Sequence, residues 1–164
     1  MKLKQNTRLA LYSMLEFAAD PKRQISAAEI SKKYEVSSHH LAKVLAELSR
    51  VGMVQSVRGV GGGYRFIGNA RRLTLMDVIS HFEDVLPLDS AHSHETPVGQ
   101  ALASVLSEID EIAKASMSSI TLATMMRIIE RQQAATKTAA TIKGKGKRST
   151  DDIAAARMRS VHAK

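Results

Sequence analysis

The chain contains no cysteine and no tryptophan among its 164 residues. Without cysteine it has no disulfide, no thiolate metal site, no cysteine nucleophile and no thiol redox sensor. Aromatic residues make up only 4% of the chain, so its core is expected to be aliphatic and methionine-rich. No apolar run approaches the roughly 20 residues of a membrane-spanning helix, and no apolar signal segment follows the basic N-terminus. These absences predict a cytoplasmic protein with no membrane partner.

Basic charge is concentrated at the two ends of the chain, which carries a net charge of +8. Residues 1–69 contain 11 Lys and Arg against 5 Asp and Glu, and residues 135–164 contain 8 against 2. Residues 70–134 are acidic, with 5 against 9. Two basic ends indicate a polyanionic partner. The charge taken alone fits equally well a protein that Lys and Arg merely keep soluble.

Apolar spacing predicts three helices in the first 50 residues. The first covers about residues 6–19 and stops at an Asp-Pro pair. The second begins at Ser26, which is spaced for a capping box with Glu29. The third follows an N-cap at Ser37 and covers about residues 38–50, with its leucines on one face and its basic side chains on the other.

A glycine-rich segment follows these helices, with the sequence Ser56-Val57-Arg58-Gly59-Val60-Gly61-Gly62-Gly63-Tyr64-Arg65. Strand-like residues flank it, which predicts a β-hairpin. No Gly-Lys-Ser/Thr follows, and the glycines lead into a strand, so phosphate-binding and dinucleotide-binding loops are excluded. Spacing alone fits an ordinary surface hairpin as well as a DNA-contacting wing. The three preceding helices favour the wing of a winged helix-turn-helix, whose third helix enters the major groove.

The predicted fold is mainly α with a small β-hairpin wing. A winged helix-turn-helix domain covers residues 1–86, including a fourth helix that is capped by Thr74 and stopped by Pro87. Residues 87–97 form a loop, and residues 98–133 hold a long dimerisation helix and a short last helix. The long helix carries an apolar stripe of the kind that packs against a second copy. Residues 134–164 form a basic tail too poor in bulky side chains to fold alone.

Three motifs resemble a known family: Ile25-Ser-x-x-Glu29-Ile30, Val36-Ser37-x-x-x-Leu41-x-x-x-Leu45-x-x-Leu48 and Arg58-Gly59-x-Gly61-Gly62-Gly63-Tyr64. They are similar to the bacterial regulators typified by IscR and NsrR, the Rrf-two family, over about residues 1–130. The resemblance implies a homodimer that binds a palindromic operator. It implies a transcription regulator, most simply a repressor, rather than an enzyme. Val60 replaces the proline usual in this family, which makes the turn less rigid.

The face of the third helix and the resemblance together predict the residues that contact DNA. They are Ser37, Ser38, His39, His40, Ala42, Lys43, Arg50, Arg58, Gly59, Gly61, Gly62 and Tyr64. The resemblance places Arg58 in the minor groove, while Lys43 and Arg50 are expected on phosphates. Plain solvent exposure remains the alternative for the histidines.

The sequence does not identify the signal that controls such a regulator. Members of the resembled family with an iron–sulfur cluster carry three cysteines after the fourth helix, and this chain has none, which excludes a thiolate-bound cluster. No cofactor is predicted. His92 and His94 suit a divalent metal, or are simply exposed in a loop. There are two alternatives. One is a small ligand or metal that acts through residues 81–100, and the other is a protein partner that binds the acidic segment 70–134. No catalytic constellation supports an enzyme.

Overall fold

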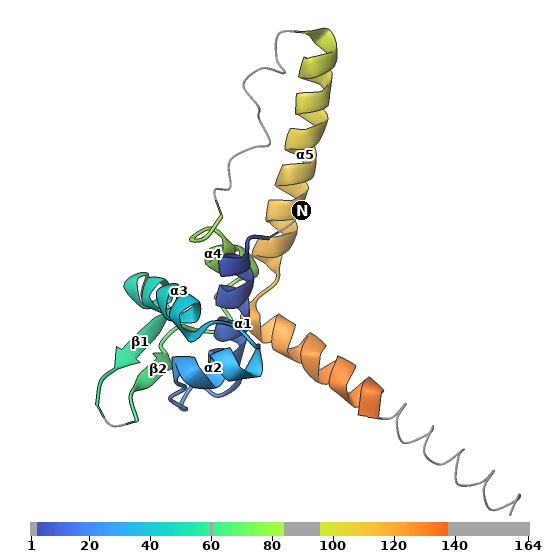
Figure 1. Cartoon of the computed structure of the whole chain (residues 1–164). Helices are drawn as coiled ribbons and strands as arrows, with labels where there is room; N and C mark the ends of the chain where they lie inside the picture. Colours follow the sequence, from blue (N-terminus) through green and yellow to red (C-terminus); the bar gives the residue numbers. More distant parts are fainter. Residues whose placement is uncertain (1–2, 60, 84–95, 138–164) are drawn as a thin grey trace, which may run out of the picture. The chain divides into compact units, whose positions relative to one another are not determined.

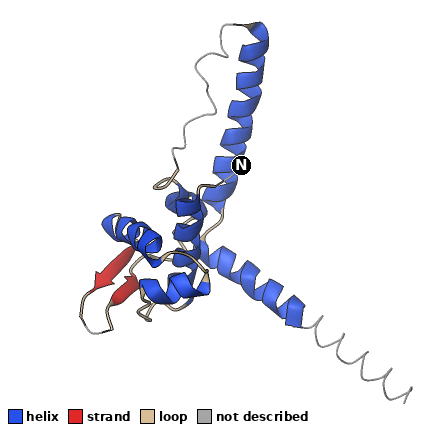
Figure 2. Ribbon diagram, in the orientation of Figure 1, coloured by secondary structure: helices blue, strands red, loops and turns tan. Residues whose placement is uncertain are grey.

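The computed structural model describes residues 3–59, 61–83 and 96–137. Contacts divide the chain into two compact units, Met1–Met126 and Arg127–Lys164. The labelled elements, all in the first unit, are α1 (Gln5–Ala19), α2 (Ala27–Lys33), α3 (Ser38–Arg50), β1 (Val54–Val57), β2 (Gly63–Phe66), α4 (Leu75–Ile79) and α5 (Pro97–Ser119) (Figures 1 and 2). Residues 122–137 are also helical. A mainly helical chain with one antiparallel hairpin confirms the predicted fold class.

Side-chain caps start α2, α3 and α4 where the sequence predicted them. Thr74 and Asp77 form a complete capping box at α4, with bonds of 3.1 Å and 2.8 Å between side chain and backbone. At α2 only half of the predicted box forms. The Ser26 hydroxyl accepts from the Glu29 backbone N–H at 3.2 Å, but the Glu29 carboxylate pairs with Arg23 instead of reaching back. Because the Glu29 carboxylate is bound to Arg23, it does not accept the Ser26 backbone N–H that would complete the capping box.

The predicted fourth helix is too long. Instead of continuing towards Pro87, α4 ends at Ile79. The next residues form a turn with hydrogen bonds between residues three apart, from the His81 N–H to the Val78 carbonyl and from the Phe82 N–H to the Ile79 carbonyl. Such 3₁₀-type hydrogen bonds, between residues three apart, commonly close the last turn of a helix. The long helix, which the apolar spacing predicts over about residues 98–115, extends to Ser119 as α5. Within the described ranges, no helix has the length and apolar character to cross a bilayer.

One hydrophobic core unites α1, α2, α3, both strands, α4 and the start of the last helix. Its buried members are Leu9, Ala10, Met14, Phe17, Ala18, Ile25, Ile30, Leu41, Val44, Leu45, Leu48, Met53, Val54, Phe66, Val78 and Leu122. The α3 members form the face that the sequence predicted. Each fully buried leucine contributes about 1.5–3 kcal/mol, so the rotation of α3 about its own axis is firmly set.

The chain that follows α5 completes this core. The Leu75 N–H donates to the Ile120 carbonyl at 2.8 Å, and the Leu122 N–H donates to the Leu73 carbonyl at 2.8 Å. Thr74 and Thr121 form an antiparallel bridge between these bonds. Leu122 thereby reaches complete burial. The winged helix-turn-helix core therefore includes residues from both sides of α5.

Candidate nucleic-acid interface

The exposed face of α3 carries His39, Lys43 and Arg50. Ser37 fixes the start of the helix, since its hydroxyl accepts from the His40 backbone N–H at 3.4 Å. Burial of the opposite leucine face turns these three side chains away from the core. Within the described residues, no hydrogen bond or ion pair engages the side chains of His39 and Lys43. Both are therefore available to a ligand.

Three other predicted contact residues on α3 either bond to neighbouring helices or are partly covered by the domain. The Ser38 hydroxyl lies 2.8 Å from the Ser31 hydroxyl of α2, and the Ala42 side chain is half-buried. The His40 Nε2 atom lies 2.5 Å from the Asn6 Oδ1 atom of α1. Asn6, His40 and Lys43 line a recess of about 280 Å³ beside α3. Asn6 gave no signal in the sequence, because its role depends on how α1 packs against α3.

Arg50 is already engaged. Its guanidinium binds the Glu47 carboxylate through two bonds, of 2.9 Å from Nε and 2.5 Å from Nη2. The paired guanidinium lowers the pKa of Glu47, and the carboxylate raises the pKa of Arg50. A phosphate would have to displace Glu47 to reach Arg50.

Replacing Glu47 with glutamine is expected to strengthen binding to a random-sequence DNA duplex about threefold to tenfold. The change removes a negative charge from the exposed face of α3 and releases Arg50 for a phosphate. Fluorescence anisotropy at two salt concentrations measures it. Glu111→Gln is the matched control, because it breaks an equivalent ion pair, with Lys114, on α5. Equal affinities for Glu47→Gln and the parent would show that Arg50 does not reach DNA.

The hairpin places Arg58 at its exposed end. Its strands pair in antiparallel register, with Gln55 opposite Arg65 and Val57 opposite Gly63. Arg58 follows β1 directly and is exposed, with no hydrogen bond or ion pair among the described residues. Arg65 is tied across the strands to Gln55 at 3.1 Å. Arg58 is thus the free cation among the described residues of the hairpin.

The predicted glycines shape the turn that carries Arg58. Gly59 and Gly61 have φ values of +113° and +78°, a region that residues with a Cβ atom rarely adopt. A Cβ atom at Gly62 would lie 2.8 Å from the Val57 carbonyl oxygen. These three positions therefore need glycine for backbone reasons, whether or not they touch a ligand.

The attachment of the base of the hairpin to the segment before α2 was not predicted from the sequence. Ile25 and Tyr64 exchange two backbone hydrogen bonds, of 3.0 Å and 2.9 Å, which add a third extended segment to the hairpin. Gly63 is in contact with Ile25, and the Gln24 side chain donates to the Gly61 carbonyl. The Tyr64 side chain packs partly against the core. The hairpin is therefore held at its base by the segment that precedes α2.

The chain is similar to transcription regulators along most of its length. It is 45% identical over 138 residues to the HTH-type transcriptional regulator BadM of Rhodopseudomonas palustris, covering 84% of this chain and 88% of that one. The structure of CymR, the global cysteine regulator of B. subtilis, matches with a TM-score of 0.68 and 25% identity, covering 78% and 98% of the two chains. IscR of T. potens matches with a TM-score of 0.66 and 26% identity, covering 81% and 91%.

A family model named Rrf2 and described as "Iron-dependent Transcriptional regulator" matches residues 3–128. The residues of this chain do not fit a thiolate-bound iron cluster, because the chain has no cysteine. In the described ranges no three His, Asp or Glu side chains gather where they could hold a metal ion. His92 and His94 lie outside those ranges, together with most of the segment 81–100 proposed as a sensor. The extent of the match and the identity to BadM show that the chain belongs to the Rrf2 family of DNA-binding transcription regulators.

Proposed function

We propose that the protein binds a palindromic DNA site as a homodimer and represses transcription, without an iron–sulfur cluster, in the cytoplasm. In this proposal α3 enters the major groove and the hairpin, now called the wing, follows the minor groove. The observation that carries the proposal is the exposed guanidinium of Arg58, which has no partner among the described residues, on a wing that is anchored to the same core as α3.

The side chains on α3 suit a division of labour in the major groove. His39 lies in the first turn of α3, the part of a recognition helix that meets base edges. Lys43 lies one turn later and suits a phosphate, which fixes register without reading sequence. Ser37, Ser38 and His40 support this face through the cap and the contacts with α1 and α2.

Arg58→Ala is expected to weaken binding to the cognate site about tenfold. An arginine in a narrow minor groove is attracted by its negative potential, and loss of one specific arginine contact costs about 1–3 kcal/mol. The control Arg71→Ala removes another exposed cation, outside α3 and the wing. Anisotropy titrations compare the two. If Arg58→Ala and Arg71→Ala behave alike, Arg58 does not enter the groove.

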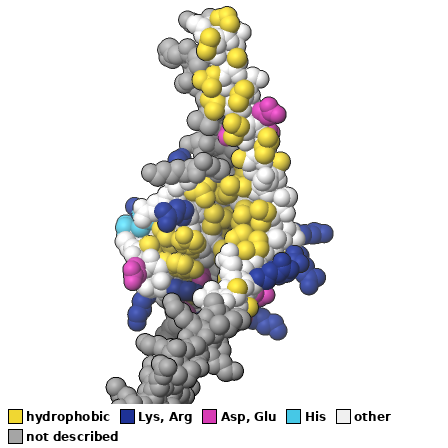
Figure 3. Space-filling model, turned by 90° about the vertical axis from the view of Figure 1, so that its right-hand side faces the viewer, with side chains coloured by type: hydrophobic (Ala, Val, Ile, Leu, Met, Phe, Trp, Pro, Cys, Tyr) yellow, Lys and Arg dark blue, Asp and Glu magenta, His cyan; other side chains and the backbone are white. Residues whose placement is uncertain are grey.

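The homodimer is supported by the apolar face of α5. No residue of this 23-residue helix is buried. Five of its large apolar residues are 54–79% exposed and follow one another at intervals of four and three residues: Val98, Leu102, Val105, Ile109 and Ile112. Figure 3 shows hydrophobic side chains along this helix. Such spacing forms the seam of a two-stranded coiled coil, and a second copy of α5 would present the same seam.

Selection of bound duplexes from a random DNA pool tests the proposal as a whole. A dimer is expected to enrich an inverted repeat whose half-sites are one helical turn apart, about 10–10.5 base pairs, or a multiple of it. This enriched duplex is called the selected site below. Placed across a promoter, it is expected to let the protein lower transcription in vitro by excluding polymerase. Enrichment of no sequence would contradict specific binding, and a rise in transcription would contradict repression.

A further inference from the structure

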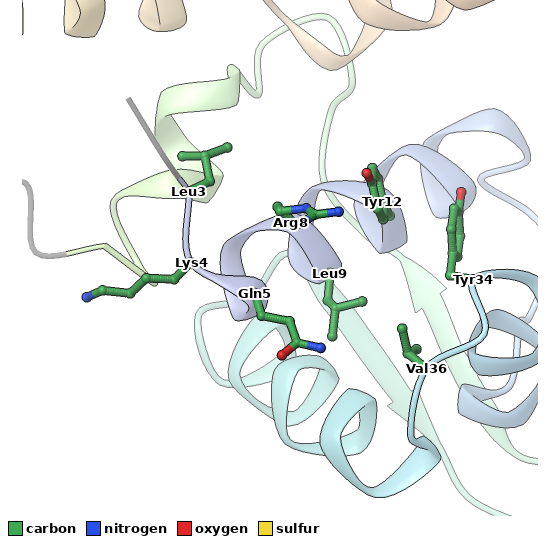
Figure 4. Close-up of a pocket in the computed structure, with 8 residues that line it drawn as sticks. All are labelled: Leu3, Lys4, Gln5, Arg8, Leu9, Tyr12, Tyr34 and Val36. Carbon is green, nitrogen blue, oxygen red and sulfur yellow. The ribbon is translucent and has the colours of Figure 1, made fainter.

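A groove of about 480 Å³ lies between α1 and the turn that joins α2 to α3 (Figure 4). The residues that matter in its lining are Gln5, Arg8, Leu9, Tyr12, Tyr34 and Val36. We propose that this groove binds a small planar carboxylate, such as an aromatic acid, and that the bound acid weakens DNA binding. The regulatory half of this inference rests on the proposed function, whereas the binding half does not.

The groove offers a free cation to a carboxylate. Arg8 is exposed, and its side chain makes no hydrogen bond or ion pair within the described residues. In Figure 4 its guanidinium extends along the groove towards Tyr12. The planar guanidinium fork matches a carboxylate through two parallel hydrogen bonds. Lys4, at the same end, is ion-paired with Glu83 at 3.7 Å, so Arg8 is the better placed of the two cations.

A rigid aromatic wall stands beside this cation. The rings of Tyr12 and Tyr34 are stacked, with centroids 4.8 Å apart and planes inclined by 12°. The Tyr34 hydroxyl donates to the Glu16 carboxylate at 2.5 Å, and Lys33 neutralises that carboxylate at 2.5 Å. Burial and the bond to Glu16 raise the pKa of Tyr34, so its hydroxyl stays protonated at physiological pH. The wall is therefore fixed before any ligand arrives.

Apolar side chains and size complete the match to an aromatic acid. Leu9 and Val36 line the groove alongside the tyrosines, and the Gln5 amide adds a neutral hydrogen-bonding group. Ligand sites for small molecules span about 300–1,000 Å³ and combine apolar walls with a few polar groups. A flat ring packs on tyrosine faces with a gain of about 0.5–1.5 kcal/mol beyond area burial. Cation, flat wall and apolar surface together select a planar organic anion over an inorganic one.

The groove adjoins the turn that orients α3. Tyr34 caps the C-terminus of α2, and Val36 precedes the N-cap of α3. Glu35 between them has φ +53°, the one non-glycine residue with positive φ among those described. A ligand that touches both neighbours of Glu35 favours one setting of this turn over others.

Two effects give the sign of the regulation. Gln5 and Arg8 lie on either side of Asn6 in α1, and the Asn6 side chain bonds to His40 of α3. A ligand that contacts Gln5 and Arg8 therefore also disturbs the bond between Asn6 and His40. The bound carboxylate neutralises the positive charge of Arg8, which a DNA polyanion would otherwise attract. Both effects lower affinity for the selected site.

Binding is tested on the full chain without DNA, with 2-naphthoate as the probe and uncharged 2-naphthamide as its match. Calorimetry is expected to give a dissociation constant below about 1 mM for 2-naphthoate and at least tenfold weaker binding for the amide. The chain has three tyrosines, and two of them line the groove. In NMR spectra the Tyr12 and Tyr34 ring signals should therefore shift on titration, while those of Tyr64 in the wing should not.

Variants separate the groove from unspecific binding. Arg8→Gln and Tyr12→Leu are each expected to weaken 2-naphthoate binding at least tenfold, and Arg71→Gln, which removes an exposed charge elsewhere, should leave it unchanged. Thermal unfolding checks that each variant is folded. Absence of saturable binding, or equal binding by Arg8→Gln and the parent, would overturn the site. If only a variant with a disrupted α5 interface bound the probe, the second copy would cover the groove in the dimer, and the site would be overturned.

The regulatory half is tested with the selected site. Saturating 2-naphthoate is expected to weaken DNA binding by the parent about fivefold and to leave Arg8→Gln unaffected. Unchanged DNA affinity with demonstrated probe binding would overturn the regulation and leave the site standing. Failure to bind DNA even without the probe would instead contradict the proposed function.

Discussion

Ile109→Asp is expected to convert the protein from dimer to monomer and to weaken binding to the selected site more than about 100-fold. Ile109 is 55% exposed in the single chain and lies within the α5 seam, with seam residues on both sides of it. In a dimer its carboxylate replacement would be buried among apolar side chains, which costs several kcal/mol. A monomer also loses the gain of about 10²–10⁴ that comes from holding two half-sites at once.

Light scattering after size-exclusion chromatography measures the first effect. The parent should have twice the 17.9 kDa mass of the chain, and Ile109→Asp should have that mass once. Ser107→Asp is the control, because it adds the same charge on the opposite side of α5. A dimeric Ile109→Asp variant would place the interface elsewhere. A monomeric variant with parental DNA affinity would separate dimerisation from DNA binding.

The sequence was sufficient for features that depend on neighbours in the chain. The N-caps at Ser37 and Thr74 and the leucine face of α3 follow from spacing and residue type, and all are present. The hairpin was predictable for the same reason, since its glycines lie together. These signals located α3 and Arg58, and hence most of the candidate interface.

Contacts between distant segments carried no such signal. The Asn6–His40 bond, the Ile25–Tyr64 bridge and the burial of Leu122 join residues that are far apart in sequence. Glu47 was also missed, because its effect on Arg50 depends on a rotamer choice rather than on helical periodicity. The groove beside α1 is of this kind, as its lining comes from two segments that only packing brings together.

Gly63→Ala is expected to weaken binding to the selected site on the order of 50-fold, more than Arg58→Ala, because it displaces the whole wing rather than one side chain. A Cβ atom at this position would lie 2.6 Å from the Ile25 carbonyl oxygen and 3.2 Å from the Ser26 Cα atom. Both obstacles are backbone, so no rotamer change relieves the overlap. The strand must move away from Ile25, which breaks the two hydrogen bonds that join Ile25 and Tyr64.

Denaturant unfolding should show a loss of about 1–3 kcal/mol for Gly63→Ala, the usual cost of an overpacked site. Ser56→Ala is the control, since Ser56 faces Tyr64 on β1 and its exposed side chain meets no such obstacle. A Gly63→Ala variant that is destabilised but keeps parental DNA affinity would mean that the attachment at Ile25 stabilises the fold without orienting Arg58. Weak DNA binding combined with parental stability would mean that the wing moves freely once detached, and that its attachment at Ile25 serves recognition alone.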